Sequence, residues 1–204
     1  MAPIEQIMRT AAVIPVLVIE DIAHAEPVAR ALVAGGLRVL EVTLRTPCAI
    51  DAIKAMKQVD GAIVGAGTVT NPDELEAALD AGSEFIVSPG LTKKLGKAAG
   101  KAGVHFLPGI ANAGDIMLGL DLGLTHFKFF PAMASGGLPA LKALAAPFYQ
   151  CKFCPTGGIS EATAPEWLAF DPVLCVGGSW VVPKGVPEEG AIEAAARAAS
   201  ALGR

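Results

Sequence analysis

Residues 39–46, VLEVTLRT, indicate a β-strand with two different faces. Apolar and polar side chains alternate along it, and alternate residues of a strand share a face. The apolar set is Leu40, Val42 and Leu44, and the polar set is Glu41, Thr43 and Arg45. In a closed barrel one face of each strand packs under helices and the other points inward. The polar set is therefore predicted to project into a barrel.

Short β-branched runs alternate with alanine-rich helical stretches along the rest of the chain. Strands are predicted at 13–19, 37–44, 62–69, 85–89, 105–110, 125–130, 152–155 and 173–177. Helices are predicted near 25–34, 48–58, 72–81, 92–102, 112–122, 136–145, 161–168 and 188–202, with an extra helix before the first strand. This alternation predicts a single-domain α/β protein over residues 1–204, a (β/α)8 (TIM) barrel; an open doubly wound sheet is the alternative.

The composition excludes several classes of protein. Apolar residues make up 52% of the chain and charged residues 18%, which argues against intrinsic disorder. The net charge of −4 offers no basic surface for nucleic acid. The longest apolar run, Ala11–Ile19, contains Pro15 and is too short to cross a bilayer. Because Met1–Thr10 has no features of a targeting signal, a soluble, cytoplasmic protein is expected, without membrane or nucleic-acid partners.

A C-x-x-C motif, Cys151 and Cys154, raises the alternative of metal or redox chemistry. Its setting, QCKFCP, indicates a strand, where residues three apart point to opposite faces. The two cysteines are therefore expected to be ordinary buried thiols. The three histidines have no ligand spacing, so no metal site is predicted.

The predicted sixth strand lies within THFKFFPA, residues 125–132, and carries Lys128 among apolar and aromatic residues. Alternation places His126, Lys128 and Phe130 on one face. A buried amine is favoured in its uncharged form, which is the form that attacks a carbonyl carbon to make a Schiff base. The alternative is an ammonium that reaches the rim or pairs with a carboxylate.

Glu41 and Arg45 add complementary chemistry from the second strand. A carboxylate there is able to move protons, and a guanidinium is able to hold a substrate carboxylate through two N–H groups. A structural Glu41–Arg45 pair, or a salt bridge between Glu41 and Lys128, is the alternative. The third strand ends in GAGTV, with the Thr68 hydroxyl at the rim, and the fourth in SPG, where Pro89 is able only to wall a pocket.

Glycine-rich turns follow the last two strands, as PTGG at 155–158 and VGGSW at 176–180. In barrels of this type the loops after strands seven and eight commonly bind phosphate. Glycines let backbone amides approach an anion, and a following helix N-terminus adds partial positive charge. Tight turns without a ligand are the alternative.

The ordered motifs LEVTLRT, GAGTV, SPGLT, FKFFPA, CPTGGI and GGSW together resemble the class I 2-keto-3-deoxy-6-phosphogluconate (KDPG) aldolases. Some members also act on 4-hydroxy-2-oxoglutarate (KHG). The resemblance runs from about Ile14 to Pro183. It implies a (β/α)8 barrel, a homotrimer, and an enzyme that needs neither cofactor nor metal. It also implies a phosphorylated 2-keto acid as substrate and pyruvate as product.

The resemblance further implies a role for each matching residue. Lys128 is expected to form the Schiff base, Glu41 to be the general acid/base and Arg45 to bind the substrate carboxylate. Residues expected to line the substrate site are Thr68, Pro89, Phe130 and Thr156, and those expected to bind phosphate are Gly157, Gly158, Gly178 and Ser179. The segment Met133–Ser135 leaves the preferred stereochemistry at C4 open.

Three other functions stay open at this point. One is an aldolase for the 6-phosphogalactonate epimer or for KHG, with the same mechanism. Another is a phosphate-binding barrel isomerase or synthase that forms no imine. The third is a protein that binds a phosphorylated metabolite without turnover.

Overall fold

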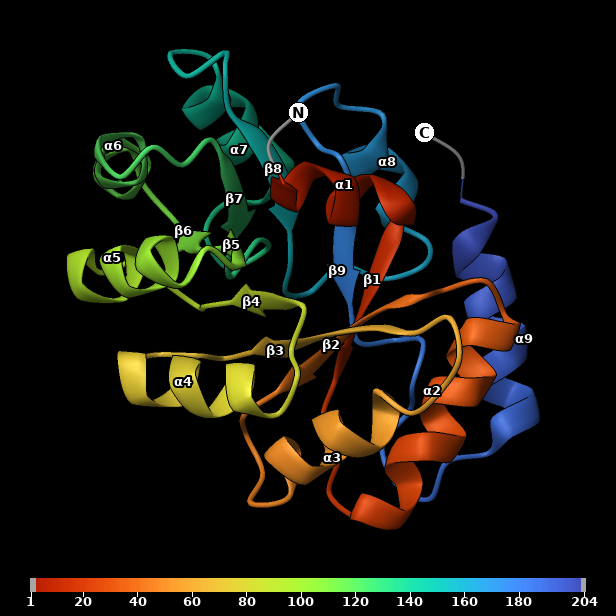
Figure 1. Ribbon diagram of the computed structural model, residues 1–204. Coiled ribbons are helices and arrows are strands. Elements are labelled where there is room, and N and C mark those ends of the chain that lie inside the picture. The colour runs from red at the N-terminus through yellow and green to blue at the C-terminus, as the bar shows by residue number, and fades with distance from the viewer. Residues whose placement is uncertain (1–2, 203–204) are drawn as a thin grey trace.

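The structure is a computed structural model that describes residues 3–202. Parallel strands alternate with helices along these residues (Figure 1). The strands are β1 (Val13–Leu17), β2 (Val39–Thr43), β3 (Ile63–Gly67), β4 (Phe85–Val87), β5 (His105–Leu107), β6 (Gly109–Ile110), β7 (His126–Phe129), β8 (Lys152–Pro155) and β9 (Val176–Gly178).

The helices cover the outside of these strands (Figure 1). They are α1 (Pro3–Thr10), the short 3-10 helix η1 (Ile22–His24), α2 (Ala25–Ala34), α3 (Ala49–Met56), α4 (Pro72–Asp80), α5 (Lys93–Ala102), α6 (Ala113–Asp121), α7 (Gly137–Ala145), α8 (Ala164–Leu168) and α9 (Glu189–Ser200). The extra helix predicted before the first strand is α1.

The strands close into a ring, which confirms the predicted (β/α)8 barrel. One sheet has the order β5-β4-β3-β2-β1-β9, and a second has the order β6-β7-β8. Bridges between Phe153 and Val173 and between Thr156 and Gly177 join β8 to β9. On the other side β5 and β6 are two parts of one extended segment, interrupted at Pro108, so β6 continues the first sheet into the second.

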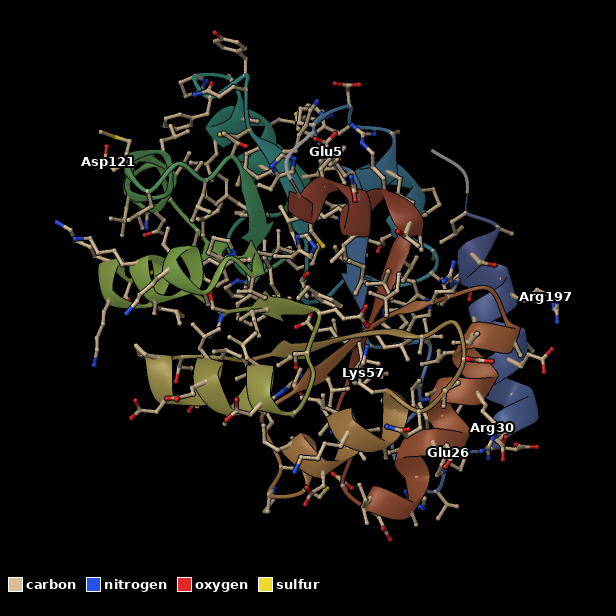
Figure 2. All side chains as sticks on the ribbon, viewed as in Figure 1. Glu5, Glu26, Arg30, Lys57, Asp121 and Arg197 are labelled. Carbon is tan, nitrogen blue, oxygen red and sulfur yellow. The ribbon has the colours of Figure 1, made fainter. Side chains whose placement is uncertain are left out.

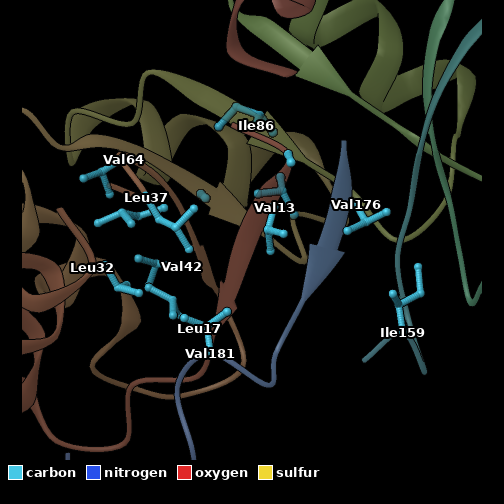
Figure 3. Close-up of a cluster of buried hydrophobic side chains, with 14 of the residues drawn as sticks. Val13, Leu17, Leu32, Leu37, Val42, Val64, Ile86, Ile159, Val176 and Val181 are labelled. Carbon is cyan, nitrogen blue, oxygen red and sulfur yellow. The ribbon is translucent and has the colours of Figure 1, made fainter. Parts of the chain in front are cut away.

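Two apolar layers follow from the alternation along the strands. Leu40 and Val42 of β2 belong to the large cluster between the strands and the helices, whereas Val39 belongs to a smaller cluster inside the barrel. Figure 3 shows part of the outer cluster, where Leu32 of α2 meets side chains of the strands such as Val42 and Leu17. Charged side chains such as Glu26, Arg30 and Arg197 lie on the outer faces of α2 and α9 (Figure 2).

Helix α1 closes the amino-terminal end of the barrel. Its apolar residues Ile4, Ile7 and Met8 belong to the same inner cluster as Phe85 and Leu107 of the strands. One turn of the helix is polar instead, because Glu5 projects from α1 and lies 3.4 Å from Nε2 of His126 on β7 (Figure 2). Arg9, one turn further on, donates a hydrogen bond to the Glu5 carboxylate at 2.7 Å.

Several predicted boundaries are wrong by a few residues, each for a local reason. The fifth strand breaks at Pro108, which has no amide hydrogen to donate to a ladder. Helix α8 begins at Ala164 rather than 161, because the segment before it forms a turn in which the Thr163 hydroxyl accepts from the Ser160 amide. The last strand runs from Val176 to Gly178 rather than from 173 to 177, and of residues 173–175 only Val173 makes an isolated bridge, with Phe153.

Candidate active site

The interior of the barrel contains a buried ion pair between opposite strands. Nζ of Lys128 on β7 lies 2.9 Å from Oε1 of Glu41 on β2, and both residues are about 95% buried or more. The pair joins residues that are 87 positions apart in the chain. Because removing two charges from water costs several kcal/mol per ion, such a pair is poor evidence for stability and better evidence for chemistry.

The sequence positions Lys128 by simple alternation. Its neighbours Phe127 and Phe129 belong to the outer cluster under the helices, so Lys128 must point inward with His126. The strand is held on one side by the Lys128 amide, which donates to the Pro108 carbonyl at 2.8 Å. The ammonium also lies 5.4 Å from the centre of the Phe130 ring, a favourable position for a cation over an aromatic face.

Gly67 on β3 leaves the space that the Glu41 side chain occupies. A Cβ atom at this position would lie 2.3 Å from Oε1 of Glu41 and 2.7 Å from its Cγ. The same device recurs on β9, where a Cβ at Gly177 would lie 2.2 Å from the hydroxyl oxygen of Thr156. Glycines of the GAGTV and VGGSW motifs therefore fix where a carboxylate and a hydroxyl sit.

Thr43 and Arg45 continue the inward polar face of β2. The Thr43 hydroxyl donates to the Leu17 carbonyl at 2.7 Å and accepts from Nε of Arg45 at 3.1 Å. This second contact ties the base of the guanidinium to the barrel wall. The remaining N–H groups of Arg45 make no other hydrogen bond with the part of the chain that the structure describes, and the residue lines a cavity.

The cavity opens at the carboxyl ends of the strands and has a volume of about 770 Å³. Six of the eleven predicted site residues line it: Arg45, Phe130, Thr156, Gly157, Gly158 and Ser179. Lys128 contacts this set through Phe130. The structure therefore brings the buried amine, a guanidinium and the glycine loops to one end of the barrel.

Two neighbouring loops form the glycine-rich wall of the cavity. Gly157 and Gly158 both have positive φ values, 104° and 78°, a conformation that side chains with a Cβ rarely adopt. The loop after β7 packs along them, since the Met133 amide donates to the Gly157 carbonyl at 3.1 Å. The Ser179 hydroxyl is exposed to solvent.

The expectation of a helix N-terminus directly behind these glycines is wrong. Helix α8 has only five residues and begins at Ala164, and α9 begins at Glu189, ten residues beyond Ser179. The first residues of α9 are acidic, with Glu188 as N-cap and Glu189 in the first turn. The loop between β9 and α9 takes the place of the expected helix, and residues 182–187 of it line the cavity.

Besides the Glu41–Lys128 pair, three predicted site residues lie outside the set that lines the cavity. Thr68 follows the last residue of β3 and has a positive φ of 61°, and Pro89 follows β4 by two residues. Gly178 ends β9 and lies under the Trp180 ring, where a Cβ would meet a ring carbon at 1.9 Å. All three stand at the same end of the barrel as the cavity, since parallel strands share one direction.

The sequence analysis missed the contribution of the first strand. Val18, Ile19, Glu20, Asp21 and His24 line the cavity, together with Val16 and Val28. Strand β1 has five consecutive buried residues and no polar alternation, so its pattern did not indicate a functional strand. The only usable signal was that Glu20 and Asp21 come soon after a predicted strand. Polar residues in that position of a barrel lie at the active-site end.

The cysteines have the arrangement that alternation predicts. Cys151 belongs to the outer cluster and Cys154 to the inner one, so the two thiols lie on opposite sides of the sheet. Burial raises the pKa of the Cys151 thiol, which makes it less reactive. Over residues 3–202, no three His, Cys, Asp or Glu side chains gather in a way that would hold a metal ion. Within the same range, every helix is too short or too polar to span a membrane.

Comparison with protein families gives one match over nearly the whole chain. The sequence model of the family described as KDPG and KHG aldolase matches residues 4–197. The KHG/KDPG aldolase of Escherichia coli K12 is 56% identical over 187 residues, which cover 91% of this chain and 88% of that protein.

Solved structures of similar proteins extend this result to the fold. The 2-keto-3-deoxy-6-phosphogluconate aldolase of Zymomonas mobilis ZM4, solved with 3-phosphoglycerate, is 62% identical and has a TM-score of 0.99, covering 100% of this chain and 98% of that one. The KDPG aldolase of Legionella pneumophila, solved with pyruvate captured as a covalent carbinolamine, is 43% identical. Its TM-score is 0.94, with 98% of this chain and 99% of that chain covered.

Proposed function

We propose that this chain, which belongs to the family of KDPG and KHG aldolases, is a Schiff-base aldolase. It cleaves 2-dehydro-3-deoxy-6-phosphogluconate into pyruvate and D-glyceraldehyde 3-phosphate. The observation that carries the proposal is the buried amine of Lys128, 2.9 Å from the Glu41 carboxylate and at the base of the open end of the barrel. The covalent carbinolamine in the Legionella relative supports the same chemistry.

Lys128 and Glu41 together supply what imine formation needs. Transfer of one proton from Nζ to the carboxylate leaves a neutral amine and a carboxylic acid. The amine adds to the C2 ketone of the substrate and gives a carbinolamine. Glu41 then returns a proton to the carbinolamine oxygen, water leaves, and a protonated imine forms.

The protonated imine makes cleavage of the C3–C4 bond feasible. Glu41, now a carboxylate, removes the proton of the C4 hydroxyl. The C3–C4 electrons move toward the iminium nitrogen and form an enamine, while C4 leaves as the aldehyde carbon of D-glyceraldehyde 3-phosphate. The enamine takes a proton at C3, and water then releases pyruvate and restores the amine.

The remaining polar residues hold the two ends of the substrate. Arg45, with Thr68, binds the carboxylate, and the guanidinium is already oriented by its contact with Thr43. The phosphate is bound by the backbone amides of the glycine loops, at Gly157, Gly158 and Gly178, and by the hydroxyl of Ser179. Holding both ends fixes the ketone beside the amine. In well-oriented reactions such positioning lowers the activation free energy by as much as about 7–11 kcal/mol.

Apolar and neutral residues form the wall between these ends. Phe130 and Thr156 line the cavity. We assign Pro89 to the same wall, because it follows β4 by two residues, and β4 pairs with β3. The preferred configuration at C4 depends on this wall and on the segment Met133–Ser135 beside Gly157 and Gly158.

A second substrate, 4-hydroxy-2-oxoglutarate, is favoured by the name of the Escherichia coli relative, a KHG/KDPG aldolase. The same imine and the same proton transfers would cleave it into pyruvate and glyoxylate. It has a carboxylate in place of the phosphate end, so the glycine loops would contribute less to its binding.

Two further parts of the proposal concern the cell and the assembly. Four free cysteines suit a reducing compartment, which supports a cytoplasmic location. Family resemblance supports a homotrimer, and sedimentation equilibrium measures the mass of the assembly directly.

Borohydride reduction in the presence of pyruvate tests the proposed chemistry. We expect a stable pyruvate adduct, and peptide mapping by mass spectrometry should place it on Lys128. The Lys128→Ala variant should give no adduct. Lys152→Ala is the matched control, because Lys152 begins the neighbouring strand β8 and pairs with exposed Asp171 at 3.3 Å. Trapping that persists in Lys128→Ala, or an adduct mapped to another lysine, would refute the assignment.

A further inference from the structure

The loop between β9 and α9 carries a lysine at the rim of the cavity. Residues 182–187 line the same cavity as Ser179, Gly157 and Gly158, and Lys184 is one of them. Its side chain is exposed and has no ion pair or hydrogen bond with any described residue. A free ammonium therefore lines the same cavity as the loops proposed to bind phosphate.

The glycine loops proposed to bind phosphate supply only neutral donors themselves. These donors are their backbone amides and the Ser179 hydroxyl. Neither following helix adds positive charge, because α8 is a single short turn and α9 begins with Glu188 and Glu189. A phosphate that carries nearly two negative charges is bound best where at least one full positive charge faces it.

Two carboxylates in the same cavity increase the need for a positive charge near the phosphate. Glu20 and Asp21 follow β1 and line the cavity, and both would repel a phosphate. One oxygen of Asp21 accepts a hydrogen bond from the Ala23 amide at 2.9 Å, but no described cation pairs with it. Arg45 is the other permanent cation among the described residues of this cavity, and it is hydrogen-bonded to Thr43. The proposed mechanism uses Arg45 for the carboxylate end.

Lys184 lies in a loop with a buried anchor and two prolines. Val181, fully buried, anchors the beginning of the loop, and Pro183 and Pro187 flank the lysine on both sides. Proline fixes the backbone φ angle and reduces the freedom of such a loop. Gly185 has a φ of 102°, and no atom lies within 4 Å of the place where its Cβ would be, so the chain turns here in open space.

We propose that Lys184 binds the phosphate group of the substrate and sets the preference of the enzyme for phosphorylated over unphosphorylated 2-keto acids. This inference rests on the proposed aldolase function and adds a substrate-binding residue to it. Since the lysine is exposed, solvent screens its charge, and the expected contribution is about two- to fivefold in affinity for the phosphorylated ligand. Screening also makes the contribution smaller at high ionic strength.

Steady-state kinetics of three variants test the specificity. Lys184→Met keeps the length of the side chain without its charge, and Lys184→Arg keeps the charge. Lys94→Met is the matched control, an exposed lysine on α5 that does not line the cavity. We expect Lys184→Met to lower kcat/KM for KDPG about two- to fivefold through KM, and kcat/KM for KHG less. Lys184→Arg and Lys94→Met should stay near the wild type.

Two additional measurements separate a local charge effect from other causes. Glu20→Gln removes a repulsive charge from the same rim, so it should change KM for KDPG in the opposite direction. The difference between Lys184→Met and wild type should shrink as sodium chloride is raised. An unchanged ratio of KDPG to KHG specificity in Lys184→Met, or an equal loss in Lys94→Met, would overturn the assignment.

Ligand binding without turnover distinguishes failure of this inference from failure of the proposed function. Calorimetric titration with 3-phosphoglycerate, which has a carboxylate and a phosphate but no ketone, reports binding without imine formation, and we expect its Kd to rise about two- to fivefold in Lys184→Met. Borohydride trapping with pyruvate reports imine formation alone and should be unaffected in this variant. Loss of trapping in the wild type would contradict the aldolase, whereas an unchanged Kd in Lys184→Met would contradict only the role of Lys184.

Discussion

Strand β7 carries two buried basic residues on one face, and each meets a carboxylate from another element. His126 lies 3.4 Å from Glu5 of α1, and Lys128, two residues further along, lies 2.9 Å from Glu41 of β2. Both basic residues are about 95% buried. The two basic residues share a strand and a face, yet the pairs stand at opposite ends of the barrel.

What differs is access. At the amino-terminal end, α1 covers the barrel with its apolar residues, and the pocket lined by Ile4 and His126 has a volume of only about 140 Å³. At the carboxyl end Lys128 lies next to Phe130, which lines an open cavity of about 770 Å³. The lesson is that a buried basic residue beside a carboxylate does not by itself indicate catalysis. A catalytic role also requires that the residue lie at the carboxyl end of the strand, where a substrate can reach it. At the other end the same kind of contact serves only the fold.

The largest expected effect comes from neutralising the carboxylate of each pair in turn. Glu41→Gln should lower kcat by about 10²- to 10⁴-fold, the usual contribution of a general acid/base, with a smaller change in pyruvate binding. Glu5→Gln is the matched variant at the other end and should leave kcat unchanged. Steady-state kinetics with KDPG measure both. Wild-type turnover in Glu41→Gln, or equal losses in the two variants, would contradict the claim that only the carboxyl end of the barrel is catalytic.

A smaller effect is expected from Gly67→Ala, which moves Glu41 without removing it. A Cβ at this position would lie 2.3 Å from the carboxylate oxygen, so the side chain must shift. A shift of about 1 Å in a reacting group is enough to cost on the order of 10²-fold, and we expect about 10- to 100-fold in kcat. Gly100→Ala on α5 is the control, because nothing lies within 4 Å of its Cβ position. Full activity in Gly67→Ala would mean that the position of Glu41 is not critical.

Much of the barrel was predictable because its signals are local. Alternation along residues 39–46 predicted which side chains of β2 face inward, and the structure agrees in each layer, with Leu40 and Val42 outside and Glu41 buried inside. The N-cap of α4 also follows from short-range chemistry, since the Asn71 side chain accepts from the amides of Asp73 and Glu74 at 3.0 Å. Local competition produced the errors, as at Pro108, where one missing donor divides a strand.

The site was less predictable, because its contacts depend on how the ring closes. The sequence analysis weighed a Glu41–Lys128 pair against a Glu41–Arg45 pair, and only the arrangement of β2 opposite β7 decides for the first. The fit of Glu41 against Gly67 depends on the register that pairs Glu41 with Gly65 and Thr43 with Gly67. The rim formed by Glu20, Asp21 and Lys184 comes from loops without any periodic pattern.

Within the carboxyl end itself, Ser179→Ala should produce an effect of about tenfold. The hydroxyl is exposed at the cavity, and a hydrogen bond to a charged group contributes about 1.5–3 kcal/mol. We expect a higher KM for KDPG and a nearly unchanged KM for KHG, with kcat little affected for both. Parallel kinetics with the two substrates provide the internal control. An equal rise in both KM values would argue against a phosphate site at Ser179.

The smallest effect belongs to the amino-terminal pair and concerns stability. Burial lowers the pKa of the His126 imidazole, while the Glu5 carboxylate opposes this and the Arg9 and Lys152 charges add to it. A hydrogen bond from Arg9 lowers the pKa of Glu5. The folded state therefore holds fewer protons on His126 than the unfolded state, whose imidazole has a pKa of about 6.5. The contribution of His126 to the free energy of unfolding is therefore fully present above about pH 6.5. It is lost as the pH falls from there through the lower pKa of the folded state.

Urea unfolding between pH 7 and pH 5 isolates His126, because the Glu5 contribution is lost only at lower pH. The free energy of unfolding of the wild type should fall with pH, with a slope from this group of at most about 1.4 kcal/mol per pH unit. His126→Gln removes the titrating ring and should flatten the curve, while kcat at pH 7 stays unchanged because the residue does not touch the cavity. An identical slope in the variant would show that other groups set the acid sensitivity, and a large loss of kcat would show that the two ends of β7 are coupled.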